Sequence, residues 1–150
     1  MSHWLYENKI IDTIPNGHFG FIYLITNLSS GRKYVGRKYF YSTRRIKVKG
    51  RKTRKVIRKE SDWKHYIGSN KTLKNDINRL GKKNFKFEIL CFGETKGQTN
   101  YLEENFQHRV GVILDDDYYN GSIGSRKFIS VKFSNKAKKI IRAFNKSGSI

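Results

Sequence analysis

Two short stretches near the N-terminus alternate apolar and polar positions as the strands of a β-hairpin do. Residues 20–27 read Gly-Phe-Ile-Tyr-Leu-Ile-Thr-Asn, and residues 32–36 read Arg-Lys-Tyr-Val-Gly. The four residues between them, Leu-Ser-Ser-Gly, are typical of a turn. Neighbouring positions in such a strand point to opposite faces, so Tyr23 shares its face with Phe21 and Ile25. The pattern predicts a hairpin that brings Tyr23 close to Tyr34.

The rest of the pattern predicts two helices and a third strand. Residues 70–80 carry apolar side chains at helical spacing, and Gly81 is suited to end that helix. Residues 85–92 form an apolar run typical of a strand. A second helix is predicted over about residues 99–114, with its apolar residues in one stripe.

Each end of the chain is predicted to form an extension of the central domain. Residues 1–18 mix apolar side chains with a Pro-Asn-Gly turn, and we expect them to pack on the domain without contributing chemistry. Residues 122–150 alternate small and basic side chains, and residues 136–144 have the pattern of a basic amphipathic helix.

The net charge of the chain indicates which classes of binding partner to expect. The 150 residues include 32 Lys and Arg against 12 Asp and Glu, a formal net charge of +20. Such an excess favours polyanions, nucleic acid first and an anionic membrane surface second. No run has the length of a membrane span or the form of a secretory signal. The single Cys91 excludes an internal disulfide, and a reducing, cytoplasmic setting is expected.

The densest positive charge lies between residues 44 and 59. Its ten cations are Arg44, Arg45, Lys47, Lys49, Arg51, Lys52, Arg54, Lys55, Arg58 and Lys59. We expect a mobile arm or small ribbon, inserted at about residues 45–60, that neutralises DNA phosphates without reading sequence. The alternative is a solvated loop, which mutual repulsion of ten unpaired charges disfavours. Trp63 and Tyr66, just beyond, are further candidate DNA contacts.

The hairpin residues resemble the GIY-YIG nuclease superfamily. Phe21-Ile22-Tyr23 matches the first motif with Phe in place of Gly, and Tyr34-Val35-Gly36 matches the second with Val in place of Ile. The run from Ser61 to Ser69, with Trp, Tyr, Gly and Ser at fixed spacing, is similar to phage-encoded members, among them homing-type enzymes. The resemblance covers about residues 19–121. It implies a small α/β domain in which helices flank a three-stranded antiparallel sheet.

The resemblance also implies roles for individual residues. Tyr23 would be the general base on water, and Tyr34 would orient water or phosphate. Arg44 or Arg45 matches an arginine that lies on the family's first helix and clamps the scissile phosphate. The histidine that the family often has one turn later is here Val48, so that role is not carried over. A phenol is a weak base at neutral pH, and neighbouring cations or bound metal would have to lower its pKa.

A helix glutamate after the third strand is the family's ligand for a divalent metal, Mg²⁺ or Mn²⁺. Glu103 and Glu104 both lie near the expected position, and Glu103 is favoured because it borders the apolar stripe while Glu104 points away. Asn120 matches a late asparagine that supports the active-site region, and His65 is a weaker catalytic candidate.

The sequence therefore predicts a metal-dependent DNA endonuclease that hydrolyses phosphodiester bonds, phage-encoded and homing-like. The alternative is a basic DNA- or RNA-binding protein, derived from a nuclease fold, that does not cut. The two differ in whether Tyr23, Tyr34, Glu103 and a guanidinium meet in space. The cleavage site, the oligomeric state and a homing rather than restriction role are left open.

Overall fold

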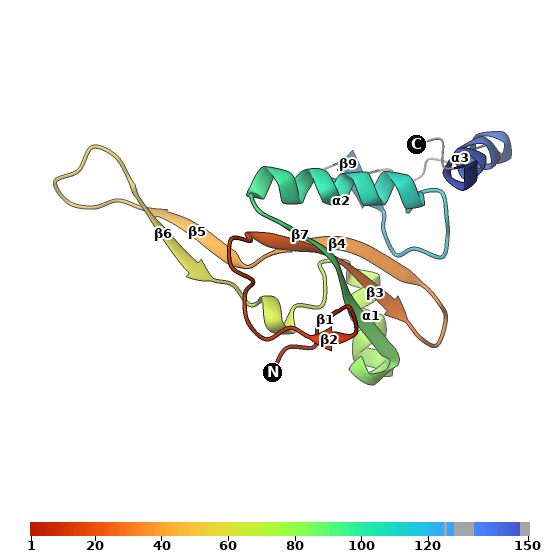
Figure 1. Cartoon of the computed structure of the whole chain (residues 1–150), viewed down its shortest axis with the longest axis horizontal. Coiled ribbons are helices and arrows are strands. Elements are labelled where there is room, and N and C mark those ends of the chain that lie inside the picture. Colours follow the sequence, from red (N-terminus) through yellow and green to blue (C-terminus); the bar gives the residue numbers. More distant parts are fainter. Residues whose placement is uncertain (125, 128–133, 148–150) are drawn as a thin grey trace.

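The computed structural model places a five-stranded sheet at the centre of the molecule (Figure 1) and describes residues 1–124, 126–127 and 134–147. The strand order is β2-β1-β7-β3-β4, so that β4 is an edge strand. The strands of this sheet are β1 (Leu5–Tyr6), β2 (Lys9–Ile10), β3 (Gly20–Asn27), β4 (Lys33–Tyr39) and β7 (Phe85–Gly93). The predicted hairpin of β3 and β4 is confirmed, with Tyr23 opposite Gly36 and Ile25 opposite Tyr34.

The three predicted strands, β4, β3 and β7, are antiparallel neighbours as expected, but the sheet has five strands instead of three. The N-terminal segment adds β1 and β2, and β1 runs parallel to β7 with Leu5 opposite Glu88. Strands of two residues are too short for alternation to reveal them, and a turn at Glu7 and Asn8 with positive φ joins them. The division into residues 1–18, 19–121 and 122–150 stays a prediction.

One helix covers each face of the sheet (Figure 1). Helix α1 (Lys71–Leu80) begins at the predicted Asn70, whose side chain accepts from the Leu73 amide, and ends at Gly81. Helix α2 (Lys96–Val110) starts three residues earlier than predicted and ends four residues earlier, at Gly111 with φ 67°. Short 3₁₀ turns, η1 (Trp63–His65) and η2 (Lys82–Asn84), precede α1 and β7.

The face under α1 holds an aromatic core. Trp4 and Trp63 are fully buried there, and the Trp4 indole donates to the Trp63 carbonyl at 2.6 Å. The prediction that Trp63 contacts DNA is therefore wrong, because its ring packs at 5.0 Å from that of Phe40 and its Nε1 donates to Glu60. The residues before Trp63 in the sequence are strongly basic, and this composition gave no indication that Trp63 is buried.

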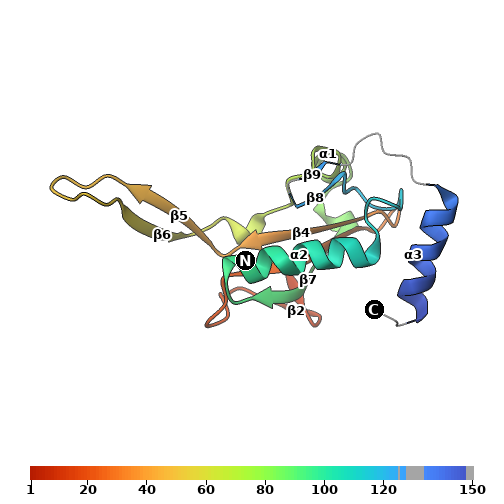
Figure 2. The same ribbon diagram turned by 90° about the horizontal axis from the view of Figure 1, so that it is seen from above.

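The basic segment forms a two-stranded antiparallel ribbon that projects from the body of the molecule (Figures 1 and 2). Its strands are β5 (Tyr41–Ile46) and β6 (Lys55–Glu60). Arg44 and Arg45 were expected on a helix, but both lie exposed on β5. Residues 41–46 have no apolar pair at helical spacing and pair instead with residues 55–60, which explains the difference.

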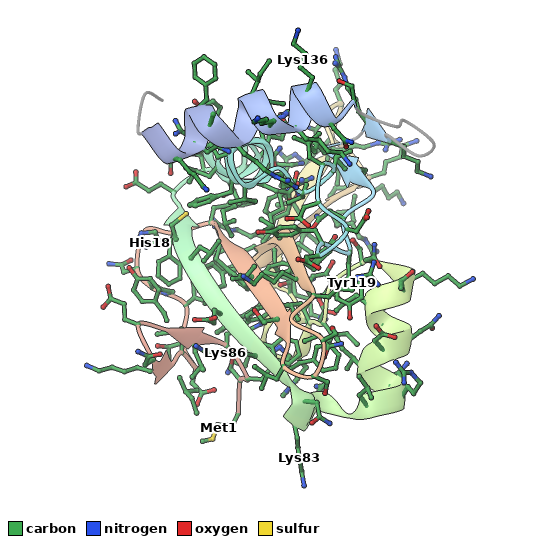
Figure 3. The ribbon with its side chains drawn as sticks, turned by 90° about the vertical axis from the view of Figure 1, so that its right-hand side faces the viewer. Met1, His18, Lys83, Lys86, Tyr119 and Lys136 are labelled. Carbon is green, nitrogen blue, oxygen red and sulfur yellow. The ribbon has the colours of Figure 1, made fainter. Side chains whose placement is uncertain are left out.

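Beyond the sheet, β8 (Ser122–Ile123) and β9 (Arg126–Lys127) form a small pair, and α3 (Asn135–Ser147) contains the predicted helix over residues 136–144. The Asn145 side chain on α3 donates to the backbone of Arg109 at the end of α2, and Figure 3 shows α3, with Lys136 labelled, across the end of the molecule. Within the described residues, no helix is long and apolar enough to cross a membrane.

Candidate active site

A cavity of about 980 Å³ lies along the edge strand β4 and takes side chains from both faces of the sheet. The face under α1 contributes the phenols, and the face under α2 contributes the carboxylate. The lining residues relevant to the chemistry are Tyr23, Tyr34, Arg37, Lys38, Tyr66, Ser69, Glu103, Gln107 and Asn120. An edge strand is the one place in a sheet where groups on opposite faces can meet without crossing a neighbouring strand.

The phenol of Tyr23 passes from β3 over β4 at Gly36. A Cβ added at Gly36 would lie 2.5 Å from the Tyr23 hydroxyl, closer than any non-bonded contact. The ring of Tyr34, two residues earlier on β4, lies with its centroid 6.1 Å from that of Tyr23. The predicted proximity of the two phenols is thus observed, and the absent side chain at Gly36 makes it possible.

The segment between η1 and α1 closes this side of the cavity. The Tyr66 ring stands edge-on to Tyr23 at 6.1 Å, and the Tyr34 hydroxyl lies 3.2 Å from the Ser69 hydroxyl. Lys38 places its ammonium 4.0 Å from the centroid of the Tyr66 ring. Tyr66 was predicted as a DNA contact, and its position in the cavity wall is compatible with that role, which stays a prediction.

Helix α2 buries a line of polar side chains beside Leu102 and Phe106, which pack against the core on this face of the sheet. Its buried residues are Thr99, Glu103 and Gln107, spaced four apart. Glu103 is 6 % exposed and lines the cavity, whereas Glu104 is exposed and does not. This is the orientation expected for a ligand at Glu103, and its role as a ligand stays a prediction.

Arg37 is a site residue that sequence reasoning missed. Its Nη1 lies 2.6 Å from Oε1 of Glu103, and its Nε donates to the Tyr39 hydroxyl at 3.0 Å. Burial raises the pKa of the Glu103 carboxyl, and the Arg37 guanidinium opposes that rise. The sequence signal for Arg37 is its place directly after Tyr34-Val35-Gly36, whereas the resemblance points to an arginine ten residues after Tyr34.

The pKa of Tyr23 moves in the direction opposite to the one a general base needs. Burial raises it well above its ordinary value, and Tyr34, Tyr66 and Glu103 raise it further. The expectation that neighbouring cations lower this pKa is therefore wrong, and its lowering by a bound metal ion stays a prediction. The ten cations of residues 44–59 that suggested such an effect lie on the exposed ribbon.

The Asn120 side chain connects the loop after α2 to the middle of β4 by hydrogen bonds. Its Oδ1 accepts from the Val35 amide at 3.1 Å, and its Nδ2 donates to the Val35 carbonyl at 2.8 Å. Both polar atoms of the Asn120 side-chain amide therefore bond to the backbone of Val35, which lies between Tyr34 and Gly36. The adjoining Tyr119, labelled in Figure 3, donates to Asp76 on α1 at 2.7 Å. Asn120 thus connects this loop to β4 at the cavity wall, and its role in supporting the site stays a prediction.

The remaining predicted residues lie outside the cavity lining. Arg44 and Arg45 are exposed on the ribbon, although its root, residues 41–43, lines the cavity. His65 is exposed on η1, with its ring 6.4 Å from that of His3. The geometry does not bring Arg44, Arg45 or His65 together with the two phenols.

The donor atoms in the cavity suit a hard divalent cation. Among the described residues no three His, Cys, Asp or Glu side chains gather, so Glu103 would be the carboxylate ligand. One turn along α2, Oε1 of Gln107 is buried without a hydrogen-bond partner, while its Nε2 donates to the Val35 carbonyl at 3.0 Å. A carboxylate with an unused amide oxygen beside it fits Mg²⁺ or Mn²⁺, which take oxygen ligands and complete their shell with water and phosphate.

Comparison with known proteins agrees with this geometry. Neither the curated proteins nor the solved structures include a match to the chain. A family model described as "Putative endonuclease segE, GIY-YIG domain" matches residues 4–123, from the buried Trp4 to β8. Because the match spans most of the 150 residues and contains both tyrosine motifs, Glu103 and Asn120, the chain belongs to the SegE-type GIY-YIG endonuclease family.

Proposed function

We propose that this chain is a divalent-metal-dependent endonuclease that hydrolyses phosphodiester bonds of DNA in the cavity along β4. The observation that carries the proposal is the meeting of Tyr23 and Tyr34 with Glu103 and Arg37 around one edge strand. Buried phenols and a carboxylate beside a guanidinium are groups that hydrolysis requires, and a domain that only binds DNA has no need of them.

Among the cations that line the cavity, Arg37 and Lys38 would hold the scissile phosphate. Both line the cavity, from adjacent positions on β4, and they point to opposite faces of the sheet. A guanidinium keeps its charge and matches two phosphate oxygens at once. In this proposal Arg37 has the phosphate-binding role that the resemblance assigned to Arg44 or Arg45. Its ion pair with Glu103 breaks when it binds the phosphate.

Glu103, with Gln107 beside it, would hold the cation, which would supply positive charge for a phenolate and for the leaving oxygen. Tyr23 would first lose its own proton to solvent, its phenolate oxygen would then accept the proton of the attacking water, and Tyr34 would orient that water from β4. Because burial and the neighbouring groups raise the pKa of Tyr23, loss of its proton requires positive charge next to the phenol. Asn120 keeps β4 in register with the loop after α2.

The ribbon supplies the contacts that hold DNA at the cavity. Its predicted phosphate-binding cations, Lys47, Lys49, Arg51, Lys52, Arg54, Lys55, Arg58 and Lys59, are all exposed. Each phosphate contact releases counterions and makes the affinity depend on salt. A phage origin, a homing-like role and a cytoplasmic setting belong to the same proposal, supported by the sequence resemblance alone.

One observation favours the alternative of a binding protein that does not cut. Arg37 pairs with the Glu103 carboxylate, which a metal ion would need as a ligand. Nicking of supercoiled plasmid decides between the two, with Mg²⁺ or with EDTA. The endonuclease nicks with Mg²⁺, loses this activity in Glu103→Gln and Tyr23→Phe, and retains it in Glu104→Gln. Salt-sensitive binding with no nicking in either condition would establish the binding protein instead.

A further inference from the structure

The β5–β6 ribbon has a surface that folding of the domain does not explain. Among its twelve strand residues only Tyr41 and Ile46 are partly covered, and the others are exposed. Val56 is 57 % exposed and Ile57 is 41 % exposed, in the middle of β6. An isolated two-stranded hairpin is at best marginally stable in water. Aliphatic side chains held out on such a ribbon indicate a partner that covers them.

The pairing register distributes the charges and the two aliphatic residues over both faces. Residues directly opposite one another share a face, so Arg45 lies with Val56, and Arg44 lies with Ile57 on the other side. Each face therefore carries cations around one exposed aliphatic side chain. Contact with phosphates accounts for the cations but gives no reason for the Val56 and Ile57 side chains.

The dimensions of the ribbon fit one groove of duplex DNA. Six residues per strand extend over roughly 20 Å, and paired strands are about 5 Å apart before side chains are added. The major groove of B-form DNA, about 12 Å wide, admits a two-stranded ribbon, whereas the minor groove, about 6 Å wide, does not. The major groove also displays the thymine methyl group, with which aliphatic side chains make contact.

The root of the ribbon is fixed against the cavity. The Arg58 guanidinium lies 3.8 Å from the centroid of the Tyr41 ring and 5.4 Å from that of Phe19. Tyr41 and Phe19 also line the cavity. A ribbon held at this point would contact DNA at a set distance from a phosphate bound in the cavity.

We propose that the ribbon lies in the major groove of B-form DNA next to the scissile phosphate, with the face of Tyr41, Arg45 and Val56 toward the base edges and Val56 against a thymine methyl group. The inference rests on the proposed function for the choice of DNA as partner. It adds that the protein distinguishes base pairs through the ribbon, where the sequence indicated phosphate contacts alone.

Fluorescence anisotropy of the full chain in EDTA tests the assignment without cleavage. The probes are a labelled A·T-rich duplex and the same duplex with uracil in place of thymine, which lacks the methyl group. We expect the wild type to bind the thymine duplex roughly threefold to tenfold more tightly. The double variant Val56→Ser, Ile57→Ser binds both alike, with an unchanged dependence of affinity on salt because the charges remain.

Two controls keep the result specific. The exchange variant Val56→Ile, Ile57→Val retains aliphatic side chains and keeps the thymine preference. Netropsin, which fills the minor groove, leaves wild-type binding unchanged within about twofold, since the ribbon enters the other groove. Equal affinity of the wild type for thymine and uracil duplexes, or displacement by netropsin, overturns the assignment.

The outcome is separable from that of the nuclease proposal. A chain that shows the thymine preference but nicks no plasmid keeps the groove assignment and loses the endonuclease. A chain that nicks plasmid but does not distinguish thymine from uracil loses the groove assignment alone.

Discussion

Gly36→Ala isolates the contact that lets the Tyr23 phenol pass over the edge strand. The added methyl would lie 2.5 Å from the Tyr23 hydroxyl oxygen, 2.6 Å from Cζ of the same ring and 2.9 Å from Cε1 of Tyr34. Non-bonded carbons rest at about 3.5–4.0 Å, so at least one phenol has to move by about 1 Å. The backbone is not the obstacle, because Gly36 does not have a positive φ.

Two magnitudes follow from this geometry. Inserting a methyl group into a packed site costs about 1–3 kcal/mol, which is the expected loss in unfolding free energy. A displacement of about 1 Å in a catalytic group can reduce the rate about a hundredfold, and this is the expected effect on plasmid nicking with Mg²⁺. Urea unfolding and initial nicking rates measure the two quantities on the same preparations.

Gly97→Ala is the matched control. Gly97 lies in the first turn of α2, and a Cβ there meets no atom within 4 Å. Alanine in place of glycine in a helix stabilises by up to about 1 kcal/mol, so this variant should unfold no more easily than the wild type and nick at the same rate. The reasoning is refuted if Gly36→Ala matches Gly97→Ala in both measurements.

Three further predictions concern single side chains. In EDTA, the unfolding free energy of the wild type should fall relative to that of Glu103→Gln as the pH rises above 4.5. The reason is that a carboxyl whose pKa is raised in the folded state holds its proton more firmly there than in the unfolded chain. Parallel urea titrations from pH 4 to 8 measure the difference between the two proteins, and a difference that does not change with pH contradicts the prediction. Tyr119→Phe removes the hydrogen bonds to Asp76 and from the buried Asn27 and should lower the unfolding free energy by about 1–3 kcal/mol, which the urea midpoint reports and an unchanged midpoint refutes. Trp63→Phe should lower stability by a similar amount, through the lost volume and the lost bond to Glu60, while DNA affinity measured by anisotropy stays the same; a loss of affinity in a folded variant would restore Trp63 as a DNA contact.

Local patterns predicted the elements whose side chains alternate or recur over several turns. The β3–β4 hairpin, α1 with its Asn70 cap, β7 and the facing of Glu103 all follow from spacing alone. The two strands before residue 11 do not, because a strand of two residues is defined by its partner and leaves no period.

The ribbon and the arginine were missed for a different reason. The prediction for Arg44 rests on its distance in sequence from Tyr34, which in the family leads to a helix. Here an inserted ribbon occupies those residues in place of the helix. Arg37 enters the site through a contact with Glu103, sixty-six residues away in sequence, which local spacing cannot show. Helix α2 also turns Thr99 and Gln107 inward, and the apolar stripe that indicated the facing of Glu103 does not reveal these two polar residues as part of the buried line.

Anomalous scattering from Mn²⁺ tests most directly whether phenols and carboxylate share one ion at the edge of the sheet. In crystals grown with Mn²⁺, the account predicts a peak at the Glu103 carboxylate, on the side of Tyr23, with Arg37 turned away from Glu103. A peak at Glu104, or a Glu103 still paired with Arg37 at saturating Mn²⁺, would contradict it.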